Sequence, residues 1–251
     1  MSSSKEKTEL ITHKNNAVRE IDGFITDLIE SMDPREMDKS DKFCYWIEDY
    51  VRFLKQEKIF KPTSLKRYKR GEIIKVHLGF NIGSEEGGLH YAVVLDKQNS
   101  IHSPVVTIVP LTSVKPTTNI KNLPDDNIYL GNEIFTGLNA QAQLKSQHLS
   151  SEIERLTREA SDLNPNSEKA EEKKRDLLTA QRDANLLRKM QKEIQKMKKG
   201  SIALINQVTT ISKIRIYDPK TNHDILSHLK LSNQKLDMID AALIARYTGR
   251  L

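Results

Sequence analysis

The sequence contains very little cysteine and no long apolar run, and both shortages narrow what the protein can be. Its single cysteine, Cys44, excludes an internal disulfide framework, and the apolar residues around it predict a buried, inert thiol. No run approaches the roughly 18 apolar residues that a membrane span needs, and residues 1–7 lack the apolar core of a signal peptide. We therefore expect a cytoplasmic protein that does not use a membrane as a partner.

Motifs for metals and nucleotides are also missing. His77, His102, His223 and His228 are scattered along the chain, and no spacing of Cys, His and Asp is typical of zinc. The glycine-containing loop at 81–88 lacks the Gly-Lys-Ser/Thr of a P-loop. We expect no metal and no cofactor.

The charge of the chain is unevenly distributed. The formal net charge of +6 favours a polyanionic partner, but residues 138–199, with 14 basic and 10 acidic residues, account for +4 of it. This segment ends in a row of lysines: Lys189, Lys192, Lys196, Lys198 and Lys199. The row is compatible with contact to RNA, although a lysine-rich helix face is most often simply solvated, so both interpretations stay open.

Short β-branched runs bounded by Gly, Asn, Ser or Pro predict the strands of one small sheet. They lie at 71–78, 90–95, 105–111, 127–130, 202–208 and 209–216. A closing amphipathic helix is predicted at Asn233–Tyr247, with a core face against the sheet. The fold class expected from this pattern is α+β.

Two further parts of the chain are predicted to be helical. Residues 1–66 form an N-terminal extension, with helices over 17–32 and 44–54; Asp33-Pro34 ends the first, and Ser40 or Asp41 caps the second. Residues 138–198 have heptad-like apolar spacing interrupted at 164–167, which predicts an inserted antiparallel coiled-coil hairpin. The sheet-forming domain is then expected at 67–137 and 199–251.

Several motifs, in a fixed order, make the chain similar to the PemK/MazF family of toxin endoribonucleases. They are Arg70-Gly71-Glu72, the loop and strand Gly83–Val94, Ser103-Pro104, Leu111-Thr112-Ser113, the run Ser201–Arg215 and the closing helix Leu231–Tyr247. The resemblance implies a small SH3-like β-barrel. It also implies a metal-independent endoribonuclease that cleaves single-stranded mRNA through attack of the 2′-hydroxyl, leaving a 2′,3′-cyclic phosphate and a 5′-hydroxyl. A cognate antitoxin protein and a homodimer are the partners that it implies.

The resemblance also points to the site residues. His90 stands where the family carries its catalytic arginine, and Thr112 matches the catalytic threonine. Imidazole titrates near neutrality and can act as acid or base, but it lacks the permanent charge and forked donors of arginine. Substrate binding is expected from Ser84, Glu85, Gly87, Gly88 and Ser113, with Glu85 orienting His90.

Two alternatives remain open at this stage. Because the loop arginine is absent, the same fold can serve as a catalytically inactive RNA- or protein-binding module, with His90 an ordinary strand residue. The basic cluster Lys66–Arg70, which contains Tyr68, is either a phosphate-binding and base-stacking segment or a solvated linker.

Overall fold

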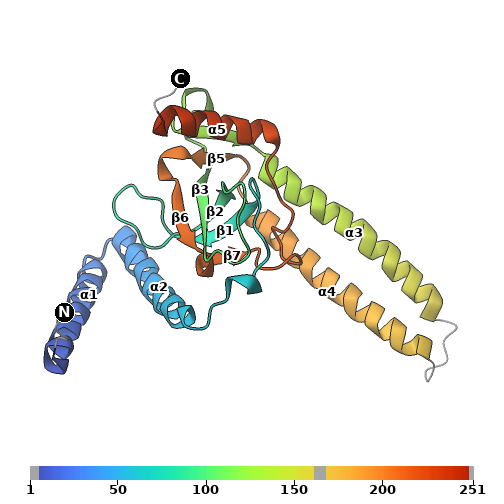
Figure 1. Ribbon diagram of the computed structural model, residues 1–251, viewed down its shortest axis with the longest axis horizontal. Coiled ribbons are helices and arrows are strands. Elements are labelled where there is room, and N and C mark those ends of the chain that lie inside the picture. Colours follow the sequence, from blue (N-terminus) through green and yellow to red (C-terminus); the bar gives the residue numbers. More distant parts are fainter. Residues whose placement is uncertain (1–5, 161–167, 249–251) are drawn as a thin grey trace. The chain divides into compact units, whose positions relative to one another are not determined.

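Seven short strands form one antiparallel sheet in the larger of the two units of this computed structural model (Figure 1). The structure describes residues 6–160 and 168–248. The strands are β1 (Ile73–His77), β2 (Leu89–Val94), β3 (Val105–Ser113), β4 (Asn127–Gly131), β5 (Ser201–Leu204), β6 (Thr209–Ser212) and β7 (Ile216–Asp218). All of them fall in or beside the predicted β-branched runs.

The strands pair in the order β4-β5-β3-β2-β1-β7, with β6 also on β3. In the described residues β4 and β7 do not pair with each other, so the closed barrel predicted from the sequence is not formed by strand pairing. The mixed helix-and-sheet class is confirmed. The two late runs are each interrupted by a 3₁₀ turn, η3 (Ile205–Gln207) after β5 and η4 (Lys213–Arg215) between β6 and β7.

Both faces of the sheet are buried, which explains why its strands read as continuous apolar runs. One face carries Ile73, Val93 and Leu111, and it packs with Leu236 and Ile239 of α5 (Asn233–Tyr247). The other face carries a second apolar cluster. Its members include Ile74, Val76, Ala92, Val94, Val106, Ile108, Ile211 and the fully buried Tyr68. The predicted closing helix is therefore confirmed, together with its core face.

Two long helices, α3 (Glu133–Ala160) and α4 (Glu168–Lys196), lie side by side and run in opposite directions between β4 and β5 (Figure 1). Their shared apolar contacts include Leu149 and Leu187, and Lys145 pairs with Asp183 at 2.7 Å. The hairpin begins five residues before the expected Leu138, and the predicted break at 164–167 lies outside the described residues. Coiled-coil packing in the strict sense stays a prediction.

The smaller unit contains the helices α1 (Lys7–Glu30) and α2 (Pro34–Glu57). The first helix ends at Glu30, just before Asp33-Pro34, as predicted, but it begins at Lys7 rather than near residue 17, and the predicted cap of the second helix at Ser40 or Asp41 was wrong. Asp33 caps α2 by accepting a hydrogen bond from the backbone of Arg35, and Pro34 occupies the first turn, where its missing N–H costs nothing. Asp33-Pro34 thus follows the end of α1 and also starts α2. Cys44 is half-buried rather than fully buried.

The basic cluster before β1 is structural. Tyr68 has no exposed surface, and its hydroxyl donates to the carbonyl oxygen of Pro219 at 2.7 Å; burial raises the pKa of this phenol. The Lys66 ammonium lies 3.1 Å from the Glu72 carboxylate, and both side chains are nearly buried. Arg70 binds the carbonyl of Leu95 and the carboxylate of Asp240. The base-stacking interpretation of Tyr68 is therefore wrong.

No helix in the described ranges is both long enough and apolar enough to cross a membrane.

A three-residue contact fastens the hairpin to the sheet. Lys75 on β1 and Tyr91 on β2 are direct cross-strand partners, and both donate to the same carboxylate oxygen of Glu193 on α4. Burial would raise the pKa of Glu193, but the bonds from Lys75 and Tyr91 outweigh it and hold the pKa below its ordinary value. Burial and the bond to Glu193 raise the pKa of Tyr91, which keeps the phenol protonated.

Removing this carboxylate should loosen the hairpin. Glu193→Ala leaves two partly buried donors without their acceptor, and we expect a loss of about 1–3 kcal/mol in the free energy of unfolding, measured by urea denaturation at pH 7. Glu172→Ala, which removes an exposed carboxylate from the same helix, serves as the control and should change stability by less than about 0.5 kcal/mol.

The same contact predicts a pH dependence. Because the pKa of Glu193 is lower in the folded protein, its contribution is complete above the unfolded value of about 4.3 and is lost as the pH falls through the folded value. The stability difference between the parent and Glu193→Ala should therefore be constant above about pH 5 and shrink below about pH 4. A difference that persists unchanged to pH 3 would contradict this assignment.

Gly71, at the start of β1, is required by its conformation and by its neighbours. Its φ is +82°, and an added Cβ would lie 2.8 Å from Leu236 Cδ1. Gly131 has a similar φ of +70° with open space around it. We expect Gly131→Ala to cost about 1–2 kcal/mol from backbone strain alone, and Gly71→Ala to cost about 1–3 kcal/mol more from the clash. If Gly71→Ala and Gly131→Ala lowered the stability in thermal unfolding by the same amount, the predicted clash with Leu236 would be contradicted.

Candidate active site

His90 and Thr112 lie on neighbouring strands and face the same side of the sheet. Tyr91 on β2 pairs with Leu111 on β3, so the next position in this register sets His90 opposite Thr112. Residues that are directly opposite in an antiparallel pair have Cβ atoms about 4.5–5.5 Å apart. Val76 on β1 pairs with His90, and Ile202 on β5 pairs with Thr112; the side chains of Val76 and Ile202 are buried. Two half-buried polar side chains are thus flanked by apolar walls.

The His90 ring is held through one nitrogen. Nδ1 lies 3.2 Å from the carbonyl oxygen of Leu111 and 3.0 Å from Oε1 of Glu86, and about a quarter of the side chain is exposed. A carbonyl oxygen can only accept, so the contact to Leu111 is a hydrogen bond when Nδ1 carries the proton. This arrangement leaves Nε2 as the nitrogen that can exchange a proton with a bound molecule.

The carboxylate beside His90 belongs to Glu86, one residue after the Glu85 that was expected to orient the ring. Ser84 and Glu85 are exposed, whereas Gly87 and Gly88 are half-buried. Gly88 has a φ of +82°, and its carbonyl accepts from the backbone of Leu78 at 2.7 Å. Glycine is therefore required where this loop turns into β2.

Gln207, on η3, holds the loop from the other side. Its Oε1 accepts from the backbone N–H of Glu86 at 3.2 Å, and its Nε2 donates to the carbonyl of Ser84 at 3.1 Å. Sequence reasoning did not select this residue. It lies within the run Ser201–Arg215 that carried the family resemblance, so its place in that run was the available signal.

Arg215, which ends that run, was also missed. Its Nε donates to the carbonyl of His77 at 2.8 Å, and its guanidinium also binds the carbonyl of Leu78. These carbonyls lie at the end of β1, so Arg215 holds the point where the chain leaves the sheet. The guanidinium of Arg215 therefore fixes the position of the backbone at the end of β1.

Ser113 does not join the other predicted residues. Successive residues of a strand point to opposite faces, so Ser113 shares the face of Leu111, where it pairs with Ser201 of β5. Thr112 is on the face of His90. The structure therefore brings together His90, Thr112 and the loop end at Gly88, and it separates Ser113 from them.

The arrangement suits proton transfer and anion binding without a metal. Within residues 6–160 and 168–248, no group of three or more His, Cys, Asp or Glu side chains is placed to hold a metal ion. Imidazole with one nitrogen held is oriented for general acid or base chemistry. A threonine hydroxyl beside it supplies a hydrogen-bond donor for an oxyanion.

The comparison with protein families agrees with this geometry. Residues 69–164 match the family described as the PemK-like, MazF-like toxins of type II toxin-antitoxin systems. The match covers β1 to β4 and all of α3, and it includes both His90 and Thr112. No curated protein matches the chain. Residues 69–164, which hold the candidate site, thus carry the match to the PemK-like, MazF-like toxin family.

Proposed function

We propose that this protein is the toxin of a type II toxin-antitoxin system and acts as a metal-independent endoribonuclease on single-stranded mRNA. The observation that carries the proposal is the pairing of His90 with Thr112 on one sheet face, inside the region that matches the toxin family. Ser84, Glu85, Gly87 and Gly88 are the proposed substrate-binding residues; Ser113, which was also predicted, lies on the other face of the sheet and is not part of the proposal. Of these, Gly87 and Gly88 offer backbone N–H groups closest in sequence to His90.

The proposed reaction needs no group beyond the chain and the RNA. The 2′-oxygen forms a bond to the adjacent phosphorus while the bond from phosphorus to the 5′-oxygen breaks, which leaves a 2′,3′-cyclic phosphate and a 5′-hydroxyl. His90 Nε2 takes the proton of the 2′-hydroxyl, or gives one to the leaving 5′-oxygen. Thr112 donates a hydrogen bond to a non-bridging phosphate oxygen, where negative charge develops.

Leu111 and Glu86 have a positioning role in this scheme. With Nδ1 directed at the Leu111 carbonyl and the Glu86 carboxylate, the ring keeps one orientation and one tautomer. The carboxylate also stabilises the imidazolium that forms when Nε2 accepts a proton. Gln207 contributes indirectly, because it holds the backbone of the loop that carries Glu86.

The proposed partners are a cognate antitoxin protein and a second copy of the chain. Two-fold homodimers are the commonest closed assembly of soluble proteins. Light scattering at micromolar concentration should give the mass of a dimer, and the mass of a monomer would contradict the proposed assembly.

A non-cleaving RNA- or protein-binding module is the second candidate function. The observation that favours it is His90 itself, since imidazole replaces a permanently charged guanidinium and its Nδ1 is already engaged. The two candidates differ in one measurable respect. A binding module retains RNA and leaves it intact at every pH.

Cleavage of a long unstructured RNA in the presence of EDTA tests the leading proposal. We expect discrete fragments with 5′-hydroxyl ends, and a loss of about 10²–10⁴-fold in rate for His90→Ala, the usual contribution of a general acid or base. Thr112→Ala should lose about 10²–10³-fold, as for other donors to a developing oxyanion. The controls are His102→Ala and Thr210→Ala, which remove the same side chains from the exposed surface and should cleave like the parent.

The role of the imidazole is tested by His90→Arg across pH 5 to 8, where histidine side chains change their charge. If the ring transfers a proton, arginine should cost about 10²–10⁴-fold and the parent rate should change across this range. If the ring supplies only positive charge, arginine should preserve cleavage and flatten the profile. A parent profile that is flat and insensitive to His90→Arg and His90→Ala would exclude His90 from the reaction.

A further inference from the structure

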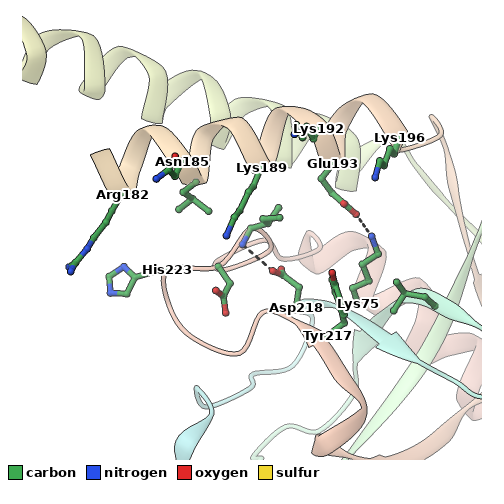
Figure 2. A pocket seen from close by; sticks show the side chains of 14 residues that line it. Lys75, Arg182, Asn185, Lys189, Lys192, Glu193, Lys196, Tyr217, Asp218 and His223 are labelled. Carbon is green, nitrogen blue, oxygen red and sulfur yellow. Dashed lines mark hydrogen bonds and ion pairs between the residues drawn. The ribbon is translucent and has the colours of Figure 1, made fainter. Parts of the chain in front are cut away.

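A cleft of about 790 Å³ lies between α4 and the edge of the sheet formed by β1 and β7 (Figure 2). Its lining residues are Lys75, Leu89, Arg182, Asn185, Leu186, Lys189, Lys192, Glu193, Lys196, Tyr217, Asp218, His223, Asp224 and Ile225. In Figure 2 the side chains of Arg182, Lys189 and Lys196 extend from α4 toward the opposite wall of the cleft. The Glu193 contact with Lys75 closes one part of the wall.

The acidic groups of this cleft are already engaged within the protein. Glu193 is bound by Lys75 and Tyr91. One oxygen of Asp224 accepts backbone N–H groups at 2.7 Å from residues 220 and 221. Asp218 accepts from the backbone of Leu226 at 2.7 Å, and burial raises the pKa of its carboxyl group. The lining therefore sets five cationic side chains, those of Lys75, Arg182, Lys189, Lys192 and Lys196, against three carboxyl groups that are already held within the protein.

Four cations of the cleft, by contrast, form no salt bridge with any described residue, although Lys196 lies near enough to Glu193 to help lower the pKa of that carboxyl group. In the described part of the chain, no carboxylate forms an ion pair with Arg182, Lys189, Lys192 or Lys196. Unpaired cations gathered in one concave site attract anions more strongly than the same charges spread over a convex surface. The cleft therefore has the electrostatic character of an anion-binding site.

The spacing of these cations indicates an extended anion. Arg182, Lys189 and Lys196 are seven residues apart, so they share one helix face at intervals of about 10 Å, and the row spans about 21 Å. A single phosphate would contact one of them at a time. A chain with repeated negative charges can contact all three.

An aromatic ring stands beside the row. Tyr217 on β7 lines the cleft and is 64% exposed, and the Lys75 ammonium lies 6.0 Å from the centre of its ring. An exposed aromatic ring next to a cationic groove is the combination that proteins use for single-stranded nucleic acids, because a base can stack where its backbone is neutralised. An acidic peptide would use the cations but would gain little from the ring.

The cleft and the candidate active site lie on opposite faces of the sheet. Lys75 is on the face of Tyr91 and Leu111, whereas His90 and Thr112 are on the other. We propose that this cleft is a second, separate RNA-binding site, which holds the phosphate backbone of single-stranded RNA along α4 and stacks a base on Tyr217. The choice of RNA as the anion rests on the proposed function.

Binding of a 12-nucleotide, fully 2′-O-methylated RNA tests the proposal, because this probe lacks the attacking 2′-hydroxyl and cannot be cleaved. Fluorescence anisotropy with the full-length protein between 50 and 200 mM salt gives both affinity and salt dependence. We expect Lys189→Gln with Lys196→Gln to weaken binding at least about tenfold at low salt and to reduce the slope of log K against log salt by about 1.4.

The matched control is Arg188→Gln with Lys198→Gln, which removes the same total charge from exposed positions that do not line the cleft. It should bind like the parent, and Tyr217→Ala should weaken binding at least about fivefold. Circular dichroism of each variant should match that of the parent, as expected for exposed substitutions.

Three results would overturn the proposal. The first is that the cleft pair and the control pair of substitutions weaken RNA binding equally, which would mean that only the net charge of the protein matters. The second is a 12-residue polyglutamate peptide that competes as well as the RNA while Tyr217→Ala has no effect, which would assign the cleft to an acidic protein segment. The third is that His90→Ala abolishes binding of the probe, which would show that the cleft is not a site separate from the candidate active site. If the protein bound the probe but did not cleave RNA, the cleft would still be an RNA-binding site, and only the proposed reaction would be excluded.

Discussion

The long central strand β3 is the constraint on which the rest of the larger unit depends. Its nine residues pair with β2 along one side, and with β6 and then β5 along the other. Two short strands that follow the hairpin in sequence are thus held by one strand that precedes it. The same register decides the candidate site, because it sets His90 opposite Thr112 and turns Ser113 to the other face. A slip of one residue would exchange these faces.

The position of the hairpin follows from the same sheet. β4 and β5 are antiparallel neighbours, so the chain that joins them must leave and return at adjacent points. A tight turn would satisfy this requirement, and so does a pair of antiparallel helices whose ends lie close together. The bond from Glu193 to Lys75 and Tyr91 then holds the returning helix against the sheet. This contact creates the cationic cleft as well as anchoring the arm, since Lys75 and Glu193 both line it.

Much of the secondary structure could be predicted from local pattern. The six β-branched runs marked the strands β1 to β6, whereas β7 begins only at the last residue of the sixth run, and the predicted helix Asn233–Tyr247 has the same bounds as α5. Errors arose where one signal has two local meanings. Asp33-Pro34 stops a helix as readily as it starts one, and the choice depends on whether α2 finds apolar partners, such as the contact of Phe43 with Phe24 at 5.3 Å. Tyr68 in a basic cluster has the composition of a nucleic-acid contact, and only burial shows that it is core.

The sequence by itself determined most of the elements, their order and the family resemblance, since these depend on residue types over short windows and on motifs in a fixed succession. It also marked His90 and Thr112 individually. Only the tertiary structure decided which side chains meet. Glu86 rather than Glu85 contacts the ring, Gln207 holds the loop from more than a hundred residues away, and Lys189 and Tyr217 line the same cleft. Such pairings depend on strand register and helix docking, which are set by the simultaneous burial of apolar side chains from distant parts of the chain and leave no local signal.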